Sequence, residues 1–217
     1  MNRILKEGKY PDGSLRFRET ESYDQPEQQA ILKEGWYPAA QRSNGQQKYK
    51  FNYVNGQKHG VQEYWYPSRI DRLDPTAVVR GGQQRHKMNY VNGQLHGVQE
   101  SWDENGRQVY KGNFVNGKQH GLQERWYWDG RQQDKENYVN GQLHGLREKW
   151  YPFLVDPSDP AVERRSGQQE YRKYYLDGIE VSQQTYQSYI EKLAPEIQAT
   201  TDFEERLSNI IAEYLLP

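Results

Sequence analysis

The sequence predicts a mainly β protein: an elongated, single antiparallel sheet of stacked β-hairpin repeats, closed by a small C-terminal α-helical cap. Three observations predict it. One motif recurs four times, glycine-centred turns cut the chain into runs of strand length, and the apolar content is low but rich in aromatic residues. Internal repeats of this kind decide the architecture before any single residue does.

The composition favours a thin sheet over a thick globular core. Of the 217 residues, 34% are hydrophobic, and the mean hydropathy is −1.21. The 18 Tyr and 6 Trp carry much of the apolar surface, and such rings bury large areas while a polar tip stays wet. Disordered chains are poor in aromatic residues, so the body of the chain is predicted to fold.

The repeat follows the pattern N-[YF]-V-N-G-x-x-H-G-[VL]-x-E-x-W. Its four copies align without gaps and begin at Asn52, Asn89, Asn113 and Asn137. Degraded copies flank them: Tyr174 to Gly178 keeps the first half of the motif, and Glu34 to Pro38 keeps the second half. Atypical ends are expected in a stack, because terminal units face water.

Two turns divide each repeat into strands. Asn-Gly, as at Asn55-Gly56, is the strongest short hairpin signal, because both central residues of a type I′ turn need positive φ. The second turn is Asn105-Gly106 or Asp129-Gly130. The runs between turns have strand length, and helices would need ten or more unbroken residues.

These spacings predict two parts. A β-hairpin repeat array covers 1–181, and a helical C-terminal cap covers 182–217. The units of the array lie at about 5–45, 46–82, 83–106, 107–130, 131–167 and 168–181.

Alternation along each strand predicts which side chains share a face. Val61, Glu63 and Trp65 lie together, with Gln62 and Tyr64 opposite. We expect Tyr53, Val61 and Trp65, with their equivalents, to stack as the buried row. The predicted structural residues of the repeat are the aromatic and glycine positions Tyr53, Gly56, Gly60, Trp65, Tyr90, Gly93, Gly97, Trp102, Phe114, Gly117, Gly121, Trp126, Tyr138, Gly141, Gly145 and Trp150.

The C-terminal part has helical periodicity. Ser182 to Leu193 reads as a helix that ends before Pro195, and Thr201 to Glu204 fits a capping box. Apolar residues then recur at helical spacing from Leu207 to Leu215. We expect a cap over the open strand edge left by the last hairpin. The alternative is an amphipathic tail that binds a partner.

Charge and composition exclude several classes. The net charge is −1 without long runs of one sign, so no nucleic-acid footprint is visible and membrane binding is not favoured. There is no cysteine, no signal-like N-terminus and no apolar window long enough to span a membrane. We therefore expect a cytoplasmic protein, in the host cytoplasm or a virion if it is viral, and not a secreted one.

The repeated polar residues predict no catalytic, metal or cofactor site. Equivalent histidines of neighbouring units would lie about 10 Å apart, too far to share one zinc ion. We expect each to pack or hydrogen-bond at the hairpin turn. The repeated glutamates, such as Glu63, occur in four equal copies, whereas catalysis normally needs one unique constellation. Charge pairing or hydrogen bonding beside the Trp row is the expected role.

Two long insertions are the feature of the sequence that most directly suggests a function. Tyr66 to Arg80 and Tyr151 to Arg165 each add 13 residues at the same repeat position. Long loops on a rigid frame often carry recognition, although each could instead fold back and shield a sheet face. The candidate partner-binding residues are the apolar ones of these loops: Ile70, Leu73, Val78, Val79, Phe153, Leu154 and Val155.

The repeat units resemble MORN repeats, in the variant with Y-x-N-G-x-x-x-G-x-x-x-x-[YW] and a period in the low twenties. The resemblance covers roughly residues 5 to 180, and His before the second Gly departs from the common form. In layout the chain is similar to MORN-repeat proteins of large DNA viruses of amoebae, and it is related to antitoxin-type variants. The family implies scaffolding, membrane-proximal docking or oligomer contacts.

Three functions remain open from the sequence. The first is a non-enzymatic scaffold that binds a protein partner, by self-association or in a larger assembly such as a viral structural component. The second is an antitoxin-type inhibitor of a toxic protein. The third is a membrane-proximal, lipid-binding scaffold, which the even charge balance makes the weakest of the three.

Overall fold

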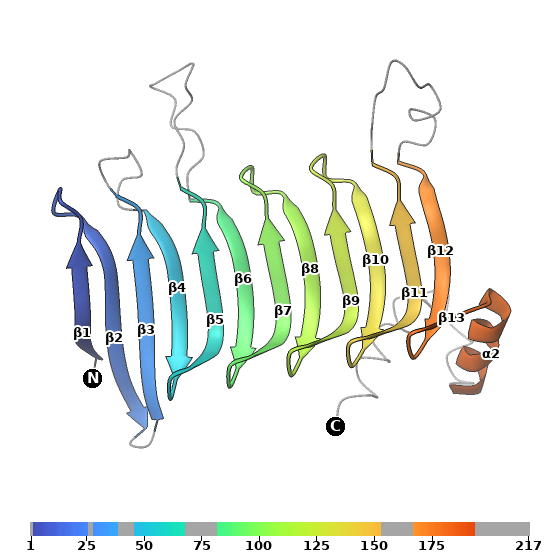
Figure 1. Cartoon of the computed structure of the whole chain (residues 1–217), viewed down its shortest axis with the longest axis horizontal. Coiled ribbons are helices and arrows are strands. Elements are labelled where there is room, and N and C mark those ends of the chain that lie inside the picture. Colours follow the sequence, from blue (N-terminus) through green and yellow to red (C-terminus); the bar gives the residue numbers. More distant parts are fainter. Residues whose placement is uncertain (1, 26–27, 39–45, 68–81, 153–166, 194–217) are drawn as a thin grey trace, which may run out of the picture. The chain divides into compact units, whose positions relative to one another are not determined.

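The computed structural model describes residues 2–25, 28–38, 46–67, 82–152 and 167–193. They form thirteen antiparallel strands, which follow one another in sheet order as they do in the chain, and one helix near the C-terminus (Figure 1). This confirms the predicted mainly β fold of successive hairpins. The chain divides into two compact units, Met1–Gln108 and Val109–Pro217, and each is described by itself.

Unit 1 contains seven of the strands, and each pairs with the strand that follows it. Within this unit the turns after β4 and β6 lie at the same end of the strands (Figure 1). The strands are β1 Asn2–Lys9, β2 Leu15–Gln25, β3 Gln28–Trp36, β4 Gln47–Val54, β5 Gln57–Trp65, β6 Gln84–Val91 and β7 Gln94–Trp102.

Unit 2 continues the same pattern and ends in the helix. Its first strand begins at the boundary between the units. The elements are β8 Gln108–Val115, β9 Lys118–Trp126, β10 Gln132–Val139, β11 Gln142–Trp150, β12 Gln169–Leu176, β13 Ile179–Val181 and α2 Gln183–Leu193.

The Asn-Gly turns have the predicted left-handed backbone. Asn55 has φ 48° and Gly56 has φ 77°, as a type I′ hairpin requires at both central positions. The equivalent pairs at Asn92, Asn116 and Asn140 have matching values, and so has Asp177-Gly178. The turns therefore set the register of each hairpin.

A bulge follows each Asn-Gly turn at the second glycine of the motif. In the β4–β5 hairpin, Tyr53 pairs with Lys58 but Phe51 pairs with Gln62, so β5 carries extra residues around Gly60. Gly60 is also left-handed, with φ 77°. The Gln62 side chain closes the bulge, because its amide donates to the Asn52 carbonyl at 2.8 Å. The repeat thus conserves a backbone kink and the side chain that satisfies it.

The predicted buried row is wrong. The two-residue turn pairs Val54 with Gln57, so the Tyr53 side chain shares a face with Lys58 and Gln62 and lies opposite Val61 and Trp65. Val61 and Trp65 are only half-buried, and Val98, the equivalent of Val61, is exposed. The residues that are buried on the Tyr53 side and its equivalents are mostly polar, and they include the glutamines Gln62, Gln99 and Gln123.

Three of the four repeat histidines fasten one hairpin turn to the next, as expected, whereas the Nδ1 atom of His96 has no hydrogen-bond partner. The Nδ1 atom of His144 accepts the Asp177 backbone N–H at 3.3 Å. The Nδ1 atoms of His59 and His120 accept the backbone N–H groups of Asn92 and Asn140 in the same way, each at 3.5 Å. A backbone bond lies beside each contact, for example from Gly178 N–H to the Leu143 carbonyl at 2.8 Å.

Tyrosine hydroxyls make a matching connection at the other end of the strands. The Tyr37 hydroxyl donates to the Trp65 carbonyl at 2.9 Å, and the Tyr66 hydroxyl donates to the Trp102 carbonyl at 3.1 Å. In unit 2 the Tyr127 hydroxyl donates to the Trp150 carbonyl at 2.7 Å. Because the last carbonyl of a strand would otherwise point to water, these bonds order the strand ends.

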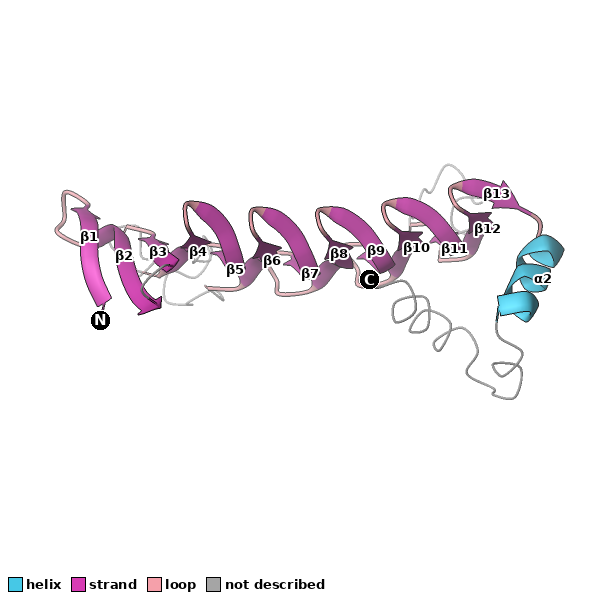
Figure 2. Ribbon diagram, turned by 90° about the horizontal axis from the view of Figure 1, so that it is seen from below, coloured by secondary structure: helices cyan, strands magenta, loops and turns pink. Residues whose placement is uncertain are grey.

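The predicted helix over 182–193 is confirmed. Ser182 caps α2, because its hydroxyl accepts the Thr185 backbone N–H at 3.0 Å. Buried Tyr186 and Ile190 pack on Tyr174, Leu176 and Val181, so the helix covers one face at the end of the unit and not only the strand edge (Figure 2). The second predicted helical segment, 201–215, lies outside the described residues.

A substitution of the turn glycine tests the left-handed backbone. A Cβ atom at Gly56 would meet nothing within 4 Å, so any cost of Gly56→Ala comes from the backbone and not from a clash. We expect the free energy of unfolding, measured by urea denaturation, to fall by about 1–2 kcal/mol. Gly56→Asn should cost less, since Asn tolerates this region better.

Gln57→Ala, at the exposed neighbouring position, is the matched control and should change stability by less than about 0.5 kcal/mol. Equal losses for Gly56→Ala and Gly56→Asn would contradict the backbone explanation.

Candidate binding faces

The predicted partner-binding residues lie outside the part of the chain that the structure describes. Those of the first insertion fall in 68–81 and those of the second in 153–166. Binding by the insertions therefore stays a prediction, and the described faces of the sheet carry the argument that follows.

The predicted repeat residues fall into four structural groups. The first glycines of the motif occupy the turns, and the second glycines, Gly60, Gly97, Gly121 and Gly145, occupy the bulges. The tryptophans end strands β5, β7, β9 and β11. The ring positions Tyr53 and Tyr90 in unit 1, and Phe114 and Tyr138 in unit 2, are half-buried on an open face.

The repeat glutamates form a ladder of alternating charge. Glu63 pairs in register with Lys50 on one side and Lys87 on the other, and it accepts a hydrogen bond from the Gln84 amide at 2.9 Å. In unit 2, Lys135 lies between Glu124 and Glu148. This bears out the expected pairing role, and each carboxylate has a complementary neighbour across the strand.

The described residues contain no group of three or more His, Cys, Asp or Glu side chains that could hold a metal ion. The helix α2 is neither long nor apolar enough to cross a membrane. Burial lowers the pKa of His120, in keeping with a neutral ring that accepts a hydrogen bond from the next turn.

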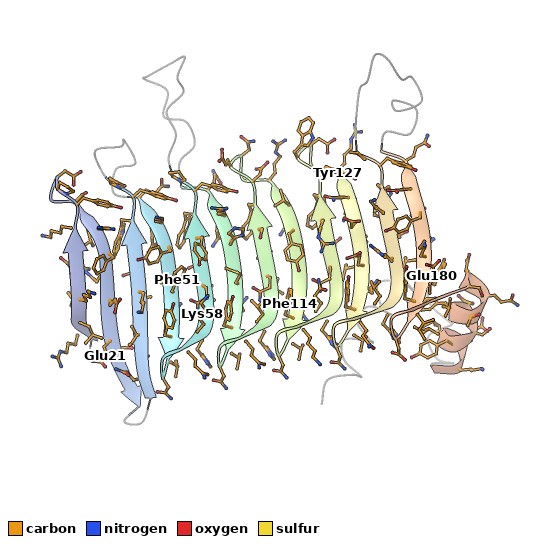
Figure 3. All side chains as sticks on the ribbon, viewed as in Figure 1. Glu21, Phe51, Lys58, Phe114, Tyr127 and Glu180 are labelled. Carbon is orange, nitrogen blue, oxygen red and sulfur yellow. The ribbon has the colours of Figure 1, made fainter. Side chains whose placement is uncertain are left out.

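The first candidate face, the tyrosine face of unit 1, lies on the side opposite the charge ladder. The register places its members on four adjacent strands, β3 to β6; Phe51 and Lys58 are labelled in Figure 3. The face consists of Lys33, Tyr49, Phe51, Tyr53, Lys58, Gln62, Tyr64, His86, Met88 and Tyr90.

Rings on this face are in contact along and across strands. Tyr49 stacks on Phe51 with centroids 4.6 Å apart, and Phe51 lies 4.7 Å from Tyr64. Tyr64 in turn meets His86 edge-on at 6.1 Å. The Lys58 ammonium lies 5.0 Å from the centre of the Tyr90 ring, within the range of a cation–π contact. The face is therefore a continuous aromatic surface with fixed side chains.

The close approach of one ring depends on a residue without a side chain. A Cβ atom at Gly35 would collide with the Tyr49 ring, so this ring lies flat on the β3 backbone. Burial raises the pKa values of Tyr64 and Tyr90, and both rings remain half-buried. The described residues of unit 1 contain no helix, so none covers this face.

The second candidate face, the ion-pair face of unit 2, has a different chemistry at the same repeat positions. The register brings its charged and tyrosine side chains together from strands β8 to β13. The face consists of Tyr110, Gln123, Arg125, Asp134, Glu136, Tyr138, Arg147, Lys149, Tyr171, Lys173, Tyr175 and Glu180.

Glu136 is the centre of this face and is buried. Its carboxylate pairs with Arg125 at 3.1 Å and with Arg147 at 2.8 Å. The Tyr138 hydroxyl donates to the same carboxylate at 3.1 Å. A buried carboxylate is costly unless it is paired and hydrogen-bonded, and here two cations and one hydroxyl meet that need.

The electrostatics follow from this burial. Burial and the Glu136 charge raise the pKa of Tyr138 to about 12. Burial also raises the pKa of Asp134, and the neighbouring Glu136 charge adds to that effect. Like charges in a partly dry site disfavour a second ionised carboxyl. The folded protein therefore disfavours the ionised form of Asp134.

Sequence reasoning missed the ion-pair face, although the repeat alignment contains its mark. The residue directly before the motif's first position is Phe51, Met88, Gly112 and then Glu136 in successive copies. This position varies while the rest of the motif repeats. Glu136 is the only carboxylate at a position that is otherwise apolar in the four copies, which indicates that this copy has a different role. Its burial and its arginine partners depend on how the strands pair, so the sequence alone does not predict them.

Comparison with protein-family models, curated proteins and solved structures gave no match.

Asp134→Asn tests the electrostatics of the ion-pair face. The pKa of Asp134 is higher in the folded protein than in the unfolded chain. As pH rises, the Asp134 carboxyl therefore loses its proton more readily in the unfolded chain, and the free energy of unfolding falls. We expect Asp134→Asn to raise the free energy of unfolding at pH 7. The gain should disappear below the ordinary carboxyl pKa of 3.8. Urea denaturation at a series of pH values measures it.

Glu124→Gln on the opposite face is the control, because Glu124 is half-exposed and pairs with Lys135 at 3.5 Å. It should give no gain at any pH. A loss of stability for Asp134→Asn at pH 7 would mean that the ionised Asp134 is a needed partner of the surrounding cations.

Proposed function

We propose that the protein is a non-enzymatic scaffold that binds a protein partner through the tyrosine face of unit 1. One observation carries this proposal: contacting aromatic side chains from adjacent strands lie half-buried on a face that no described helix of the unit covers. The cores of protein interfaces are enriched in Tyr, Phe, Met and Arg and depleted in Glu and Asp. The composition of this face fits that profile.

The rigidity of the face favours binding. Tyr53 is held under the Lys33 ammonium at 5.3 Å, and His86 Nδ1 lies 2.8 Å from the Ser101 hydroxyl. Side chains that are already ordered lose little conformational entropy when a partner docks. Aromatic residues held in this way are the usual hot spots of protein interfaces.

The opposite face does not offer the same surface. Its glutamates and lysines alternate in register and neutralise one another, and exposed ion pairs contribute little net free energy. Four near-identical carboxylates, each already paired, supply no unique acid–base constellation. The resemblance to MORN repeats supports the same kind of function, since that family mostly provides scaffolding. Self-association and a larger assembly are both forms of the proposal.

Removing two rings of the face tests the proposal. Full-length protein serves as bait in its native source, and a near-stoichiometric partner is identified by mass spectrometry and purified. We expect Tyr53→Ser with Tyr90→Ser to weaken the reconstituted complex at least about tenfold, the equivalent of 1.4 kcal/mol. Isothermal titration calorimetry measures the change. The double Phe variant keeps both rings and should bind nearly as well as the wild type.

The matched control changes the other face of the same strands: Lys50→Ser with Lys87→Ser should leave binding unchanged. Melting curves show whether each variant is folded. If the double lysine variant lost binding to the partner and the double Tyr→Ser variant kept it, the tyrosine face would be rejected as the binding site. A tight one-to-one complex with a toxic protein would favour the antitoxin alternative, and flotation with anionic liposomes would favour the lipid scaffold.

A further inference from the structure

The ion-pair face of unit 2 separates its charges by depth. The Glu136 side chain is 5% exposed, whereas the Arg125 and Arg147 side chains that pair with it are 38% and 32% exposed. Asp134 is buried as well. The carboxylates therefore form a lower layer, and the guanidinium groups form the layer that meets solvent.

The positive layer extends along the neighbouring strands. Lys149 and Lys173 flank Arg147 in the register and are each more than a third exposed. Both ion-pair with carboxylates of the same unit, Glu170 and Glu180, at 2.9 and 2.8 Å. The charges nearly cancel at a distance, and Glu180 is itself 51% exposed. Only at the centre of the face, where Arg125 and Arg147 lie over the buried Glu136, does an approaching group meet cations first.

Each arginine is fixed and has donors to spare. A guanidinium group carries five N–H donors in a plane, and Glu136 is contacted by Nη1 of Arg125 and by Nε of Arg147. The ring centres of Tyr110 and Tyr171 lie 5.7 and 5.6 Å from the two guanidinium carbons. The Glu136 carboxylate below and the tyrosine rings beside them hold both arginines in place. The exposed part of each arginine side chain remains in contact with solvent.

We propose that unit 2 binds an acidic segment of a protein partner, whose carboxylates pair with Arg125 and Arg147. The proposal rests on the proposed scaffold function and names the chemistry of a second contact on the partner. Guanidinium groups recognise carboxylates through paired, charge-assisted hydrogen bonds. Arginines held in advance lose less entropy on binding.

The charge pattern favours a short acidic peptide over a polyanion. Binding to nucleic acid grows with the number of phosphates that a protein neutralises, and here the buried Glu136 and Asp134 offset the two arginines. Anionic lipid surfaces likewise attract runs of uncompensated basic residues. A few carboxylates placed at short range match this face better, because only short-range contacts distinguish the outer cations from the inner anions.

Fluorescence anisotropy with a labelled octaglutamate peptide tests the proposal, at roughly 50 mM salt where exposed charges are weakly screened. The full chain should bind it, and Arg125→Gln with Arg147→Gln should weaken binding at least about tenfold. Glu136→Gln should act in the opposite direction and tighten binding severalfold, because it removes the inner negative charge while its amide oxygen and the tyrosine rings still order the arginines. A merely structural role for the cluster cannot produce these opposite effects.

Arg172→Gln is the matched control. Arg172 lies on the opposite face of β12, pairs with Glu148 at 3.5 Å and is 43% exposed, so its loss removes one positive charge, as each single arginine substitution does, at similar exposure. This variant should bind octaglutamate as the wild type does. Melting curves confirm that each variant is folded, and the comparison of Glu136→Gln with wild type remains decisive if the double arginine variant unfolds.

Three outcomes overturn the inference: no octaglutamate binding, equal binding by the arginine variants, or weaker binding by Glu136→Gln. Arginine-dependent binding to vesicles that contain phosphatidylserine, an anionic lipid of the cytoplasmic leaflet, but not to the peptide would assign the face to lipid. A partner that still depends on Tyr53 and Tyr90 while octaglutamate fails would refute only this inference. Loss of that dependence, with octaglutamate still bound, would refute only the tyrosine-face proposal.

Discussion

The fastening of each hairpin to the next is the constraint on which the rest of the structure depends. A single-layered sheet has no common interior, so its units must be held together through the backbone and its immediate neighbours. His59 and the Lys58 carbonyl hold the turn at Asn92 and Gly93, and the Tyr66 hydroxyl holds the far end at Trp102. A hydrogen bond typically contributes about 1 kcal/mol, and equivalent bonds recur at His120, His144, Tyr37 and Tyr127.

This construction leaves the sheet faces free to vary. Apart from the face that packs against α2, no described face forms a packed core, so the position before the motif can hold Phe51 in unit 1 and Gly112 or Glu136 in unit 2. Gly112 lets the Tyr110 hydroxyl reach the Gln123 amide oxygen at 2.6 Å, a space that a larger residue would fill. The conserved motif builds the frame, and the varied positions decide what each face can bind.

Local features were predictable from sequence and long-range ones were not. The Asn55-Gly56 turn, the strands and the helix after Ser182 follow from residues close together in the chain. The burial of Gln62 depends on a bulge that forms only when β4 and β5 pair. The cluster around Glu136 forms only when three strands pair in register, because Arg125 lies on β9, Glu136 on β10 and Arg147 on β11. Periodicity within one strand contains no such information.

Glu136 shows why recognition and stability need not coincide in a thin sheet. Replacing a buried ion pair by apolar residues is often neutral or stabilising, and Phe51 shows that this repeat position accepts a ring. A carboxylate here therefore gives no obvious gain in stability. What it does provide is position: the buried carboxylate holds the exposed Arg125 and Arg147 side chains at 3.1 and 2.8 Å. On a face without a core, an anchored charge is the means by which a flat surface can prefer one partner over another.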